Sequence, residues 1–517
     1  MKHLLWSLFL VMPLFGQDYF TERYQPFQEN IPAPKDFLGY EIGSQHTRHD
    51  QIVSYLEQIA KVSDRAQIMY YGKTHEGRKL PLLVISSKEN LANLESIQKL
   101  HLDYAKGLLS EEPDIPLILN LAYNVHGNEP SSSEAALLSA YTLTASIEKQ
   151  IISFRENAII FVDPTINPDG RDRHTQWANS YKGNPLVSDP MDAEHNEVWP
   201  GGRTNHYWFD LNRDWLLAIN PESQGKLAWY HQWYPNVVTD FHEMGSQSSY
   251  FFEPMKANGS LDPIMPKDNY IKLNDLFASY FSKNLDSIGS LYFTKEAFDG
   301  TYPGYGSSYP DLQGGLGLLF EQASSRGHKQ KTKYGYITFP FTIRNQFVSS
   351  MATVQAAVEN KSTLRTYQKA FFKSAKEISA KSKIKAYTFT EKDQNRNKAF
   401  IDKLIRHKVS VLKTGKNTFA VPTNQAQYRM VQTFFETYES YNDSVYYDAS
   451  AWSVANFYNI KYAASNKIIK GTEIKSTEEL IALKPLELSS YAYAVDSKDY
   501  NLPAFIYEAQ QHQIVVA

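Results

Sequence analysis

Residues 115–129 read IPLILNLAYNVHGNE, an apolar run that passes directly into a polar turn. The segment Ile115–Tyr123 is almost continuously apolar, which is typical of a strand that is covered on both faces. His126 and Glu129 follow at once, and side chains of these two types can share one metal ion. The pair alone is weak evidence, because about one such spacing is expected by chance in a chain with 14 histidines. A hydrogen-bonded surface pair is the competing interpretation.

Short apolar runs alternate with longer amphipathic stretches from about residue 40 to residue 365. Helix-like segments such as Ser131–Thr144 separate runs that have the length of buried strands. This alternation predicts an α/β fold with a mixed, mostly parallel central sheet flanked by helices. The further predicted strands are Leu80–Ser86, Ala158–Val162, Asn236–Asp240 and Leu316–Phe320.

Three more polar signals follow predicted strands. His242 comes after the strand Asn236–Asp240, Glu321 ends the run LGLLFE, and the turn INPDGR occupies residues 166–171. A lone histidine is more often structural than a ligand, and a carboxylate such as Glu321 is either a helix cap or a general base of raised pKa. However, ligands bind at the carboxyl edge of open α/β sheets, where all these residues are expected. The two-histidine, one-carboxylate set that catalytic zinc commonly uses would consist of His126, Glu129 and His242.

The segment GRTNHYWFDLNRDW, residues 202–215, places charged side chains among aromatic rings. Buried charges need partners, and an arginine guanidinium matches the two oxygens of a carboxylate, so this segment predicts a recognition site. A solvated loop is the alternative. Further along the chain, Gly300–Gly306 (GTYPGYG) is predicted to be a mobile loop that carries Tyr302 and Tyr305, as lids often do.

The composition narrows the possible functions. The chain has 517 residues, with 53 Lys and Arg against 56 Asp and Glu and no dense basic block, which argues against nucleic acid as the main ligand. There is no cysteine, so disulfides and cysteine nucleophiles are excluded, and any metal must be bound by histidine and carboxylate. Beyond the N-terminus no stretch reaches the roughly 20 apolar residues that a membrane span needs.

The two ends of the chain carry the predictions about domains. Residues 1–16, MKHLLWSLFLVMPLFG, have the charged start and short apolar core of a secretory signal peptide, so a secreted or periplasmic protein is expected. A buried helix is the alternative. The remaining predictions are a catalytic domain over 17–369, a linker or exposed helix over 370–394, and a small α/β domain over 395–517. The chain ends on the apolar residues IVVA, which suggests that this small domain is truncated.

Taken in order, the motifs resemble those of a zinc carboxypeptidase of the carboxypeptidase A-like (funnelin) superfamily. They span about residues 36–330 and are specific as a set, although no single member is. The wording HGNE and DLNR is most similar to the regulatory branch of that superfamily. The motifs are Gly72…Glu76-Gly77-Arg78, His126-Gly127-Asn128-Glu129, Asn167-Pro168-Asp169-Gly170, Gly202-Arg203…Asp210-Leu211-Asn212-Arg213, His242 and Glu321.

The resemblance implies a function and a role for each matching residue. The chain would be an exported zinc metallocarboxypeptidase that hydrolyses the C-terminal peptide bond of peptides or proteins, with one zinc ion per chain. Glu321 would be the general base, and Arg203 would polarise the scissile carbonyl, with Arg171 and Arg173 as weaker candidates for that role. By the same resemblance, His126, Glu129 and His242 would bind zinc, Asp210 would orient His126, and Asn212 and Arg213 would bind the substrate carboxylate beneath Tyr302 or Tyr305.

Two features depart from the family pattern. The regulatory branch carries a β-sandwich after its catalytic domain, whereas the predicted appendage here is α/β. Ser308, which lies roughly where the family sets its side-chain preference, is neutral, so no preference for basic C-terminal residues is predicted. Two other functions stay open. One is a zinc amidohydrolase acting on cell-wall peptides or acylated amino acids, and the other is a catalytically silent module that binds peptide C-termini.

Overall fold

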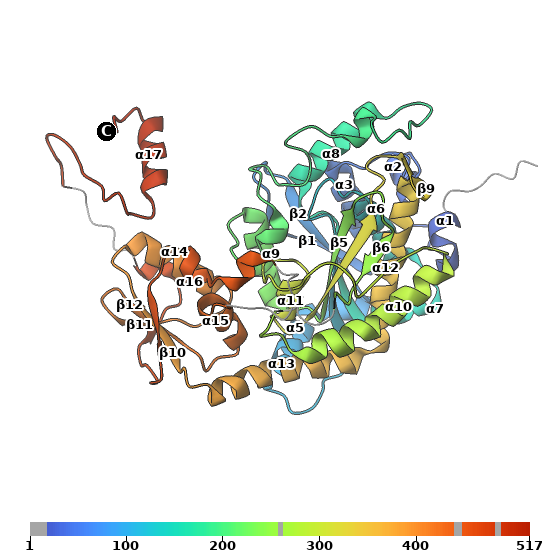
Figure 1. Cartoon of the computed structure of the whole chain (residues 1–517). Coiled ribbons are helices and arrows are strands. Elements are labelled where there is room, and N and C mark those ends of the chain that lie inside the picture. Colours follow the sequence, from blue (N-terminus) through green and yellow to red (C-terminus); the bar gives the residue numbers. More distant parts are fainter. Residues whose placement is uncertain (1–17, 257–261, 439–446, 481–486, 517) are drawn as a thin grey trace, which may run out of the picture.

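The computed structural model describes residues 18–256, 262–438, 447–480 and 487–516. The predicted signal peptide, residues 1–16, lies outside the described residues. The described chain forms a large α/β domain and a small one, and the long helix α13 (Lys361–Lys381) runs from the first to the second (Figure 1). No helix in these ranges is long and apolar enough to cross a membrane.

Within the described residues, seven strands form the central sheet of the large domain, in the order β1-β2-β4-β3-β5-β7-β6. The neighbouring strands β4, β3, β5 and β7 are parallel, and the flanking pairs are antiparallel. The sheet is therefore mixed, as predicted, with its parallel pairs in the middle. The strands are β1 (Ala66–Lys73), β2 (Lys79–Ile85), β3 (Leu117–Ala122), β4 (Ala158–Asp163), β5 (Val237–Met244), β6 (Tyr250–Phe252) and β7 (Leu316–Ala323).

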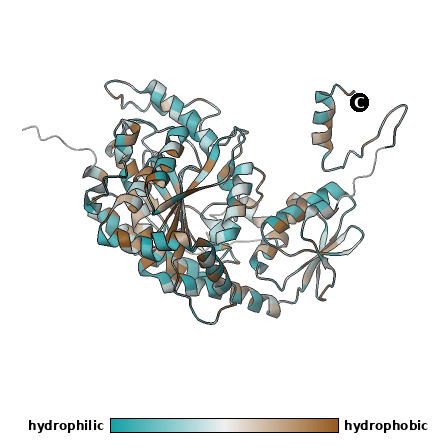
Figure 2. Ribbon diagram, turned by 180° about the vertical axis from the view of Figure 1, so that it is seen from behind, coloured by the Kyte–Doolittle hydropathy of each residue, from teal (hydrophilic) through white to brown (hydrophobic). Residues whose placement is uncertain are grey.

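Helices cover both faces of this sheet, because alternate side chains of a strand point to opposite faces. In β3, Leu119 packs into the core beneath α3, α6, α10 and α12, whereas Ile118 packs into the core beneath α5 and α9. Figure 2 shows the apolar residues concentrated in the central strands, with polar residues on the outer sides of the helices. The bounds of these helices are α3 (His49–Val62), α5 (Leu94–Ala105), α6 (Ser131–Ala145), α9 (Pro221–Trp233), α10 (Asn274–Ser287) and α12 (Phe339–Glu359).

The remaining elements of the large domain are short or peripheral. The hairpin β8–β9 precedes α12, and the very short helix α11 precedes β7. Their bounds are α1 (Asp18–Thr21), α2 (Pro34–Leu38), α4 (Lys88–Ala92), α7 (Lys149–Asn157), α8 (Pro168–Tyr181), α11 (Ser308–Asp311), β8 (Lys329–Thr332) and β9 (Gly335–Thr338).

The small domain has its own antiparallel sheet, for which the described residues give the order β13-β10-β12-β11-β14. Helices α14, α15 and α16 accompany it, and α17 projects away from the rest of the molecule in both views (Figures 1 and 2). The bounds are β10 (Ala386–Thr390), α14 (Gln394–Arg406), β11 (Leu412–Gly415), β12 (Thr418–Pro422), α15 (Tyr428–Phe435), α16 (Val454–Phe457), β13 (Tyr462–Ser465), β14 (Thr472–Glu473) and α17 (Leu502–Gln511).

The segment 370–394, predicted as a linker or exposed helix, is more ordered than that. Its first part is the end of α13, in which Phe371, Phe372 and Ala375 are buried. Its second part contains β10, which pairs with two neighbours inside the small sheet. The lysines in the helical part of this segment lie on the outer side of the helix, so the average composition hides the apolar residues on its inner side. The chain therefore enters the small domain before residue 395.

The candidate site lies where the order of the parallel strands reverses. From β3 the chain next adds β4 on one side of β3 and later adds β5 on the other side. The connections after β3 and β5 therefore leave the sheet edge in opposite directions and open a crevice at the carboxyl ends of these strands.

Candidate metal and substrate site

The turn after β3 positions the first two candidate ligands. Asn124 has a φ of 57°, a left-handed backbone conformation that asparagine tolerates better than most residues. Its side-chain nitrogen donates to the carbonyl oxygens of His126 (2.8 Å) and Glu129 (2.9 Å), which closes the turn. Gly127 is needed because a Cβ at that position would lie 2.1 Å from the backbone nitrogen of Arg171.

The side chains of His126, Glu129 and His242 converge on one point. The Nδ1 atom of His126 lies 3.0 Å from Glu129 Oε1, and the Nδ1 atom of His242 lies 3.0 Å from Glu129 Oε2. The two Nδ1 atoms are 3.1 Å apart. Ligand atoms about 2 Å from a tetrahedral zinc ion would be roughly 3.3 Å from one another, so this donor set fits a metal ion. All three side chains are buried, and the cluster could hold a metal ion.

A carboxylate holds the far nitrogen of each histidine. His126 Nε2 lies 2.9 Å from Asp210 Oδ1, and His242 Nε2 lies 2.8 Å from Asp240 Oδ1. Because a carboxylate only accepts hydrogen bonds, the contact with Asp210 puts the hydrogen of His126 on Nε2 and leaves its Nδ1 a lone pair for a metal ion. The charge of Asp240 favours the same arrangement in His242, whose Nε2 also lies 3.0 Å from the amide nitrogen of Asn212. Asp240 is not among the predicted residues. Its signal is the period of two along a strand, which puts residues 240 and 242 on the same face.

The surroundings of this cluster favour a positive charge. Burial lowers the pKa of His126, but Glu129 and Asp210 outweigh burial and raise that pKa above its usual value. Burial also lowers the pKa of His242, but Asp240 and Glu129 outweigh it and raise that pKa well above its usual value. Burial alone would raise the pKa of Glu129, yet the two adjacent histidines hold it well below its usual range. A potential that favours a cation where the Nδ1 atoms meet is also what a divalent metal ion requires.

A cavity of about 270 Å³ opens onto the cluster. It brings together the predicted metal ligands, Glu321, Arg203, Asn212, Arg213 and Tyr305, while the predicted Asp210 lies behind His126. Apolar side chains form part of the wall, so the cavity offers both polar and apolar contacts. The lining residues are His126, Glu129, Arg203, Asn212, Arg213, His242, Glu243, Met244, Phe298, Asp299, Tyr305, Ser307, Leu319 and Glu321.

Glu321 lies on β7 directly opposite His242 in the pairing with β5. Burial raises the pKa of the Glu321 carboxyl to about 8. The charges of His242 and His126 act against this shift, and the charge of Glu129 adds to it. A carboxyl with such a pKa beside a candidate metal site can take up and return a proton near neutral pH.

The segment after residue 202 supplies three donor side chains to the cavity. Arg203 is half exposed, and its Nη2 donates to Asp210 Oδ2 at 2.9 Å. The side-chain oxygen of Asn212 accepts the backbone N–H of Gly306 at 2.7 Å, which turns its amide nitrogen toward the histidine cluster. Arg213 is one-third exposed, and among the described side chains its nearest carboxylate oxygen is 4.0 Å away on Asp210. The Nη1 atom of Arg203 lies 3.2 Å from His126 Nδ1 and 3.5 Å from Glu129 Oε1, so this guanidinium reaches the metal cluster itself, and Arg213 keeps donors for a ligand.

The two weaker arginine candidates have structural positions. Arg171 is fully buried, where it pairs with Glu134 at 2.8 Å and donates to a backbone carbonyl of the N-terminal segment. Arg173 donates to the carbonyl oxygens of Gly201 (2.9 Å) and Asn205 (2.9 Å) and so fixes the loop that carries Arg203. Of the three predicted arginines, Arg203 is the one that lines the cavity.

The two predicted loop tyrosines are placed differently. Tyr305 lines the cavity, and the guanidinium carbon of Arg213 lies 4.7 Å from the centre of its ring. Tyr302 is buried on the other side of the loop, where its hydroxyl donates to the carbonyl oxygen of Arg213 at 3.1 Å. Tyr305 is therefore the member of the pair that faces the cavity, although Tyr302 supports the same arginine.

Two acidic side chains of the cavity wall are absent from the predicted set. Glu243 is buried and accepts the backbone N–H of Ser131 at 2.8 Å, which ties β5 to the start of α6. Asp299 accepts the hydroxyl of Thr301 at 2.7 Å. Glu243 is the next residue after the predicted His242, and this neighbourhood is a signal in the sequence. Asp299 has no such signal, because only the fold of its loop brings it to the cavity.

The fold and the site define an α/β protein with a candidate metal centre at the carboxyl edge of its parallel strands. Residues 52–278 match the family model described as zinc carboxypeptidase. This segment therefore matches the zinc carboxypeptidase family, as the motifs predict. The matched range includes the cluster of His126, Glu129 and His242 and ends before Glu321. Kinship with the regulatory branch stays a prediction.

Several solved carboxypeptidase structures are similar to this chain. The metallo-carboxypeptidase from Burkholderia cenocepacia is 15% identical, and the match covers 60% of this chain and 69% of that chain with a TM-score of 0.42. Carboxypeptidase A from Helicoverpa armigera is 14% identical, with 66% and 77% covered and a TM-score of 0.40. The metallo-carboxypeptidase from Pseudomonas aeruginosa is 14% identical, with 61% and 69% covered and a TM-score of 0.40. Comparison with curated proteins gives no significant match.

Proposed function

We propose that this chain is an exported zinc metallocarboxypeptidase that removes the C-terminal residue of peptides or proteins. The observation that carries the proposal is the composition of one cavity. It contains a buried donor set for a metal ion, a carboxyl of raised pKa opposite that set, and arginine donors on the adjoining wall. A metal-dependent hydrolase of peptide bonds uses the first two groups, and the third suits recognition of a chain end.

The substrate would enter with its terminal carboxylate toward Arg213 and Asn212. A guanidinium binds the two oxygens of a carboxylate with parallel hydrogen bonds, which a mid-chain peptide group cannot accept in the same way. Tyr305 would cover the bound residue from the loop side. The cavity of about 270 Å³ has room for the side chain of that residue.

The proposed reaction assigns the proton transfers to Glu321. A zinc ion held by His126, Glu129 and His242 would polarise the scissile carbonyl and increase the acidity of water. Glu321 accepts a proton from the attacking water while the new carbon–oxygen bond forms. Arg203 stabilises the negative charge that develops on the carbonyl oxygen. When the carbon–nitrogen bond breaks, Glu321 gives the proton to the leaving amine, and two products with ordinary termini result.

Mass spectrometry of a mixed peptide library tests this function. The wild-type protein is expected to contain one zinc ion per chain and to shorten peptides one residue at a time from the C-terminus. Peptides with an amidated C-terminus, which lack the carboxylate, are the matched substrate control. Glu321→Gln is expected to keep its zinc and to lower the rate by at least about 100-fold, because the proton acceptor is lost. Normal hydrolysis by this variant would contradict the mechanism.

Other outcomes identify the competing functions. Bound zinc without any shortening of peptides would favour an amidohydrolase that acts on cell-wall peptides or acylated amino acids. Binding of peptide C-termini without zinc or turnover would favour a silent binding module. Export is tested separately, by N-terminal sequencing of the protein recovered from expressing cells, which should begin at or near Gln17.

A further inference from the structure

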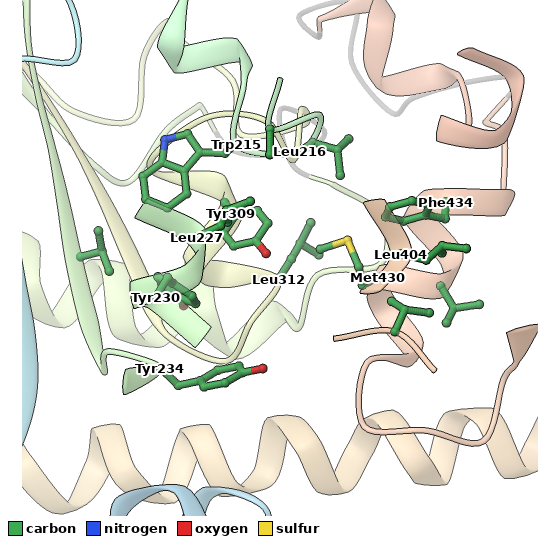
Figure 3. Close-up of a cluster of buried hydrophobic side chains, with 14 of the residues drawn as sticks. Trp215, Leu216, Leu227, Tyr230, Tyr234, Tyr309, Leu312, Leu404, Met430 and Phe434 are labelled. Atoms are coloured by element: carbon green, nitrogen blue, oxygen red, sulfur yellow. The ribbon is translucent and has the colours of Figure 1, made fainter. Parts of the chain in front are cut away.

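The small domain packs against the wall of the site that carries Arg213. One cluster of buried apolar side chains continues from the large domain into the small one (Figure 3). In this cluster Leu312 of the large domain faces Met430 of the small domain, and Trp215 and Leu216 come directly after the arginine segment. The labelled members are Trp215, Leu216, Leu227, Tyr230, Tyr234, Tyr309 and Leu312 from the large domain, and Leu404, Met430 and Phe434 from the small domain.

Buried hydrogen bonds between the two domains reinforce this apolar contact just after the segment that carries Arg213. The Nε2 atom of His407 lies 2.7 Å from the carbonyl oxygen of Leu216, and its Nδ1 lies 2.7 Å from the hydroxyl of Tyr309. Lys403 donates to the carbonyl oxygen of Ala218 at 3.0 Å. Residues 216–218 follow Arg213 within five positions, so the small domain anchors the backbone that presents this arginine.

Tyr447 of the small domain also contacts the arginine side chain itself. The guanidinium carbon of Arg213 lies 5.1 Å from the centre of the Tyr447 ring and 4.7 Å from that of Tyr305. The two rings are 5.9 Å apart, so they touch one another and form a corner for the guanidinium. Tyr447 does not line the cavity and contacts the site through Arg213 and Tyr305.

The loop that carries Tyr305 is held by the same part of the small domain. The backbone N–H of Tyr447 donates to the Thr301 hydroxyl at 3.2 Å, and the Ser450 hydroxyl lies 3.0 Å from the same oxygen. Thr301 in turn donates to Asp299 in the cavity wall. Both the arginine and the loop opposite it are therefore fixed by contacts with residues 447–450.

The other partners of Arg213 leave its orientation loosely defined. Its Nη1 donates to the carbonyl oxygen of Asn212 at 3.1 Å, and in the part of the chain that the structure describes its nearest carboxylate oxygen, on Asp210, is 4.0 Å away. Aromatic faces attract a guanidinium without occupying its in-plane N–H donors. Tyr447 also accepts a side-chain hydrogen bond from the guanidinium, so the corner formed by Tyr305 and Tyr447 can fix the plane of the group and still leave donors for a carboxylate.

We propose that Tyr447 is a positioning residue for Arg213, and that the small domain thereby belongs to the recognition site for the substrate's terminal carboxylate. This inference rests on the proposed carboxypeptidase function. It gives the small domain a role in substrate affinity, since the large domain alone supplies only one of the two rings that orient the arginine.

Steady-state kinetics on the full-length chain test this role. Tyr447→Ala is expected to raise KM about ten-fold for a peptide with a free carboxylate and to change kcat by less than three-fold, because the reacting groups are untouched. Tyr447→Phe keeps the ring and is expected to restore KM to within about two-fold of wild type. Tyr491→Ala removes a tyrosine that is almost fully exposed and serves as the matched control with wild-type KM. Equal zinc content confirms that each variant is folded at the metal site.

A binding measurement separates positioning from a general loss of structure. In a Glu321→Gln background, calorimetry compares a tripeptide with a free carboxylate against the same tripeptide with a C-terminal amide. Tyr447→Ala is expected to reduce the preference for the carboxylate about ten-fold while binding of the amide stays the same. If the wild-type protein trims peptides, an unchanged preference for the carboxylate in Tyr447→Ala would overturn the inference about Tyr447. A KM of Tyr447→Ala equal to that of Tyr491→Ala would do the same. Neither result would affect the proposed function. If the wild-type protein neither binds nor trims peptides, the proposed function fails and the inference fails with it.

Discussion

At the scale of single residues, the candidate metal site depends on carboxylates that do not themselves face the metal position. Asp210 comes from a loop and Asp240 from the same strand as the histidine that it contacts. Each fixes the protonated nitrogen of one imidazole ring and so turns the other nitrogen toward Glu129. The orientation of His126 and His242 is therefore set before any metal ion arrives, which lowers the entropy cost of binding one.

Asp240→Asn should weaken the binding of zinc by 10- to 100-fold, because an amide accepts the His242 hydrogen less strongly than a carboxylate does. The change is measured by titration against a competing chelator. Asp64→Asn is a matched control at an exposed position. Zinc affinity equal to that of the control variant would show that Asp240 does not support the ligand.

At the scale of secondary-structure elements, the site depends on how closely β7 approaches the loop before it. A Cβ at Gly317 would lie 1.6 Å from the carbonyl oxygen of Ser307, a backbone atom that cannot rotate away. Ser307 lines the cavity, and Glu321 lies on the same strand as Gly317. The absence of a side chain at residue 317 therefore lets the strand with the proposed base lie against the cavity wall.

Gly317→Ala should reduce the free energy of unfolding by at least about 2 kcal/mol, since the added methyl group must push the strand and the loop apart. Denaturation by urea measures this loss. Gly245→Ala, at a position with open space around it, is expected to change stability by less than about 0.5 kcal/mol. Equal midpoints for the two variants would refute the close approach.

At the scale of the whole molecule, a chain of buried hydrogen bonds joins the two domains. His231 Nε2 lies 2.9 Å from the Tyr309 hydroxyl, and that hydroxyl lies 2.7 Å from His407 Nδ1. His407 also contacts the Leu216 carbonyl oxygen. Burial lowers the pKa of His407 to about 4, so this histidine is neutral in the folded protein at physiological pH.

The stability of the joined domains should fall in mild acid. The unfolded chain takes up a proton at His407 near pH 6.5, whereas the folded chain takes it up only near pH 4, so the unfolded state binds more protons between these values. The stability that comes from the neutral His407 is fully present above about pH 6.5. Its loss lowers the free energy of unfolding by about 2 kcal/mol between pH 7.5 and pH 5.0. Urea denaturation at the two pH values measures it. His407→Gln is expected to show a smaller difference in unfolding free energy between the two pH values. The control His512→Gln, at an exposed position, is expected to show the wild-type difference. A wild-type difference in His407→Gln would contradict the assignment.

Much of the large domain follows from local pattern. The apolar runs at residues 115–123, 158–162 and 316–320 contain or begin the strands β3, β4 and β7, because a segment covered on both faces must be apolar throughout. The polar residues that follow such runs lie at one sheet edge. The edge strands β1 and β6 are harder to predict from the sequence, since β1 is only partly buried and β6 is three residues long.

The small domain is harder to predict for a similar reason. Strand β10 lies within a segment rich in Lys and Ser, and the buried face of α13 carries only a few apolar residues. Composition averaged over such a segment resembles that of a linker. Burial of these residues depends on the second sheet and on the interface between the domains, which no short window of sequence contains.

The amino-acid sequence by itself determined the fold class, the residue types of the site and the strands that they follow, because these depend on periodicity and spacing over a few residues. Only the tertiary structure decided that Asp240 supports His242, that Tyr305 rather than Tyr302 faces the cavity, and that Tyr447 meets Arg213. The two faces of the Arg213 corner come from segments more than 140 residues apart. Contacts of this kind depend on how the whole chain packs, and local propensity carries no record of them.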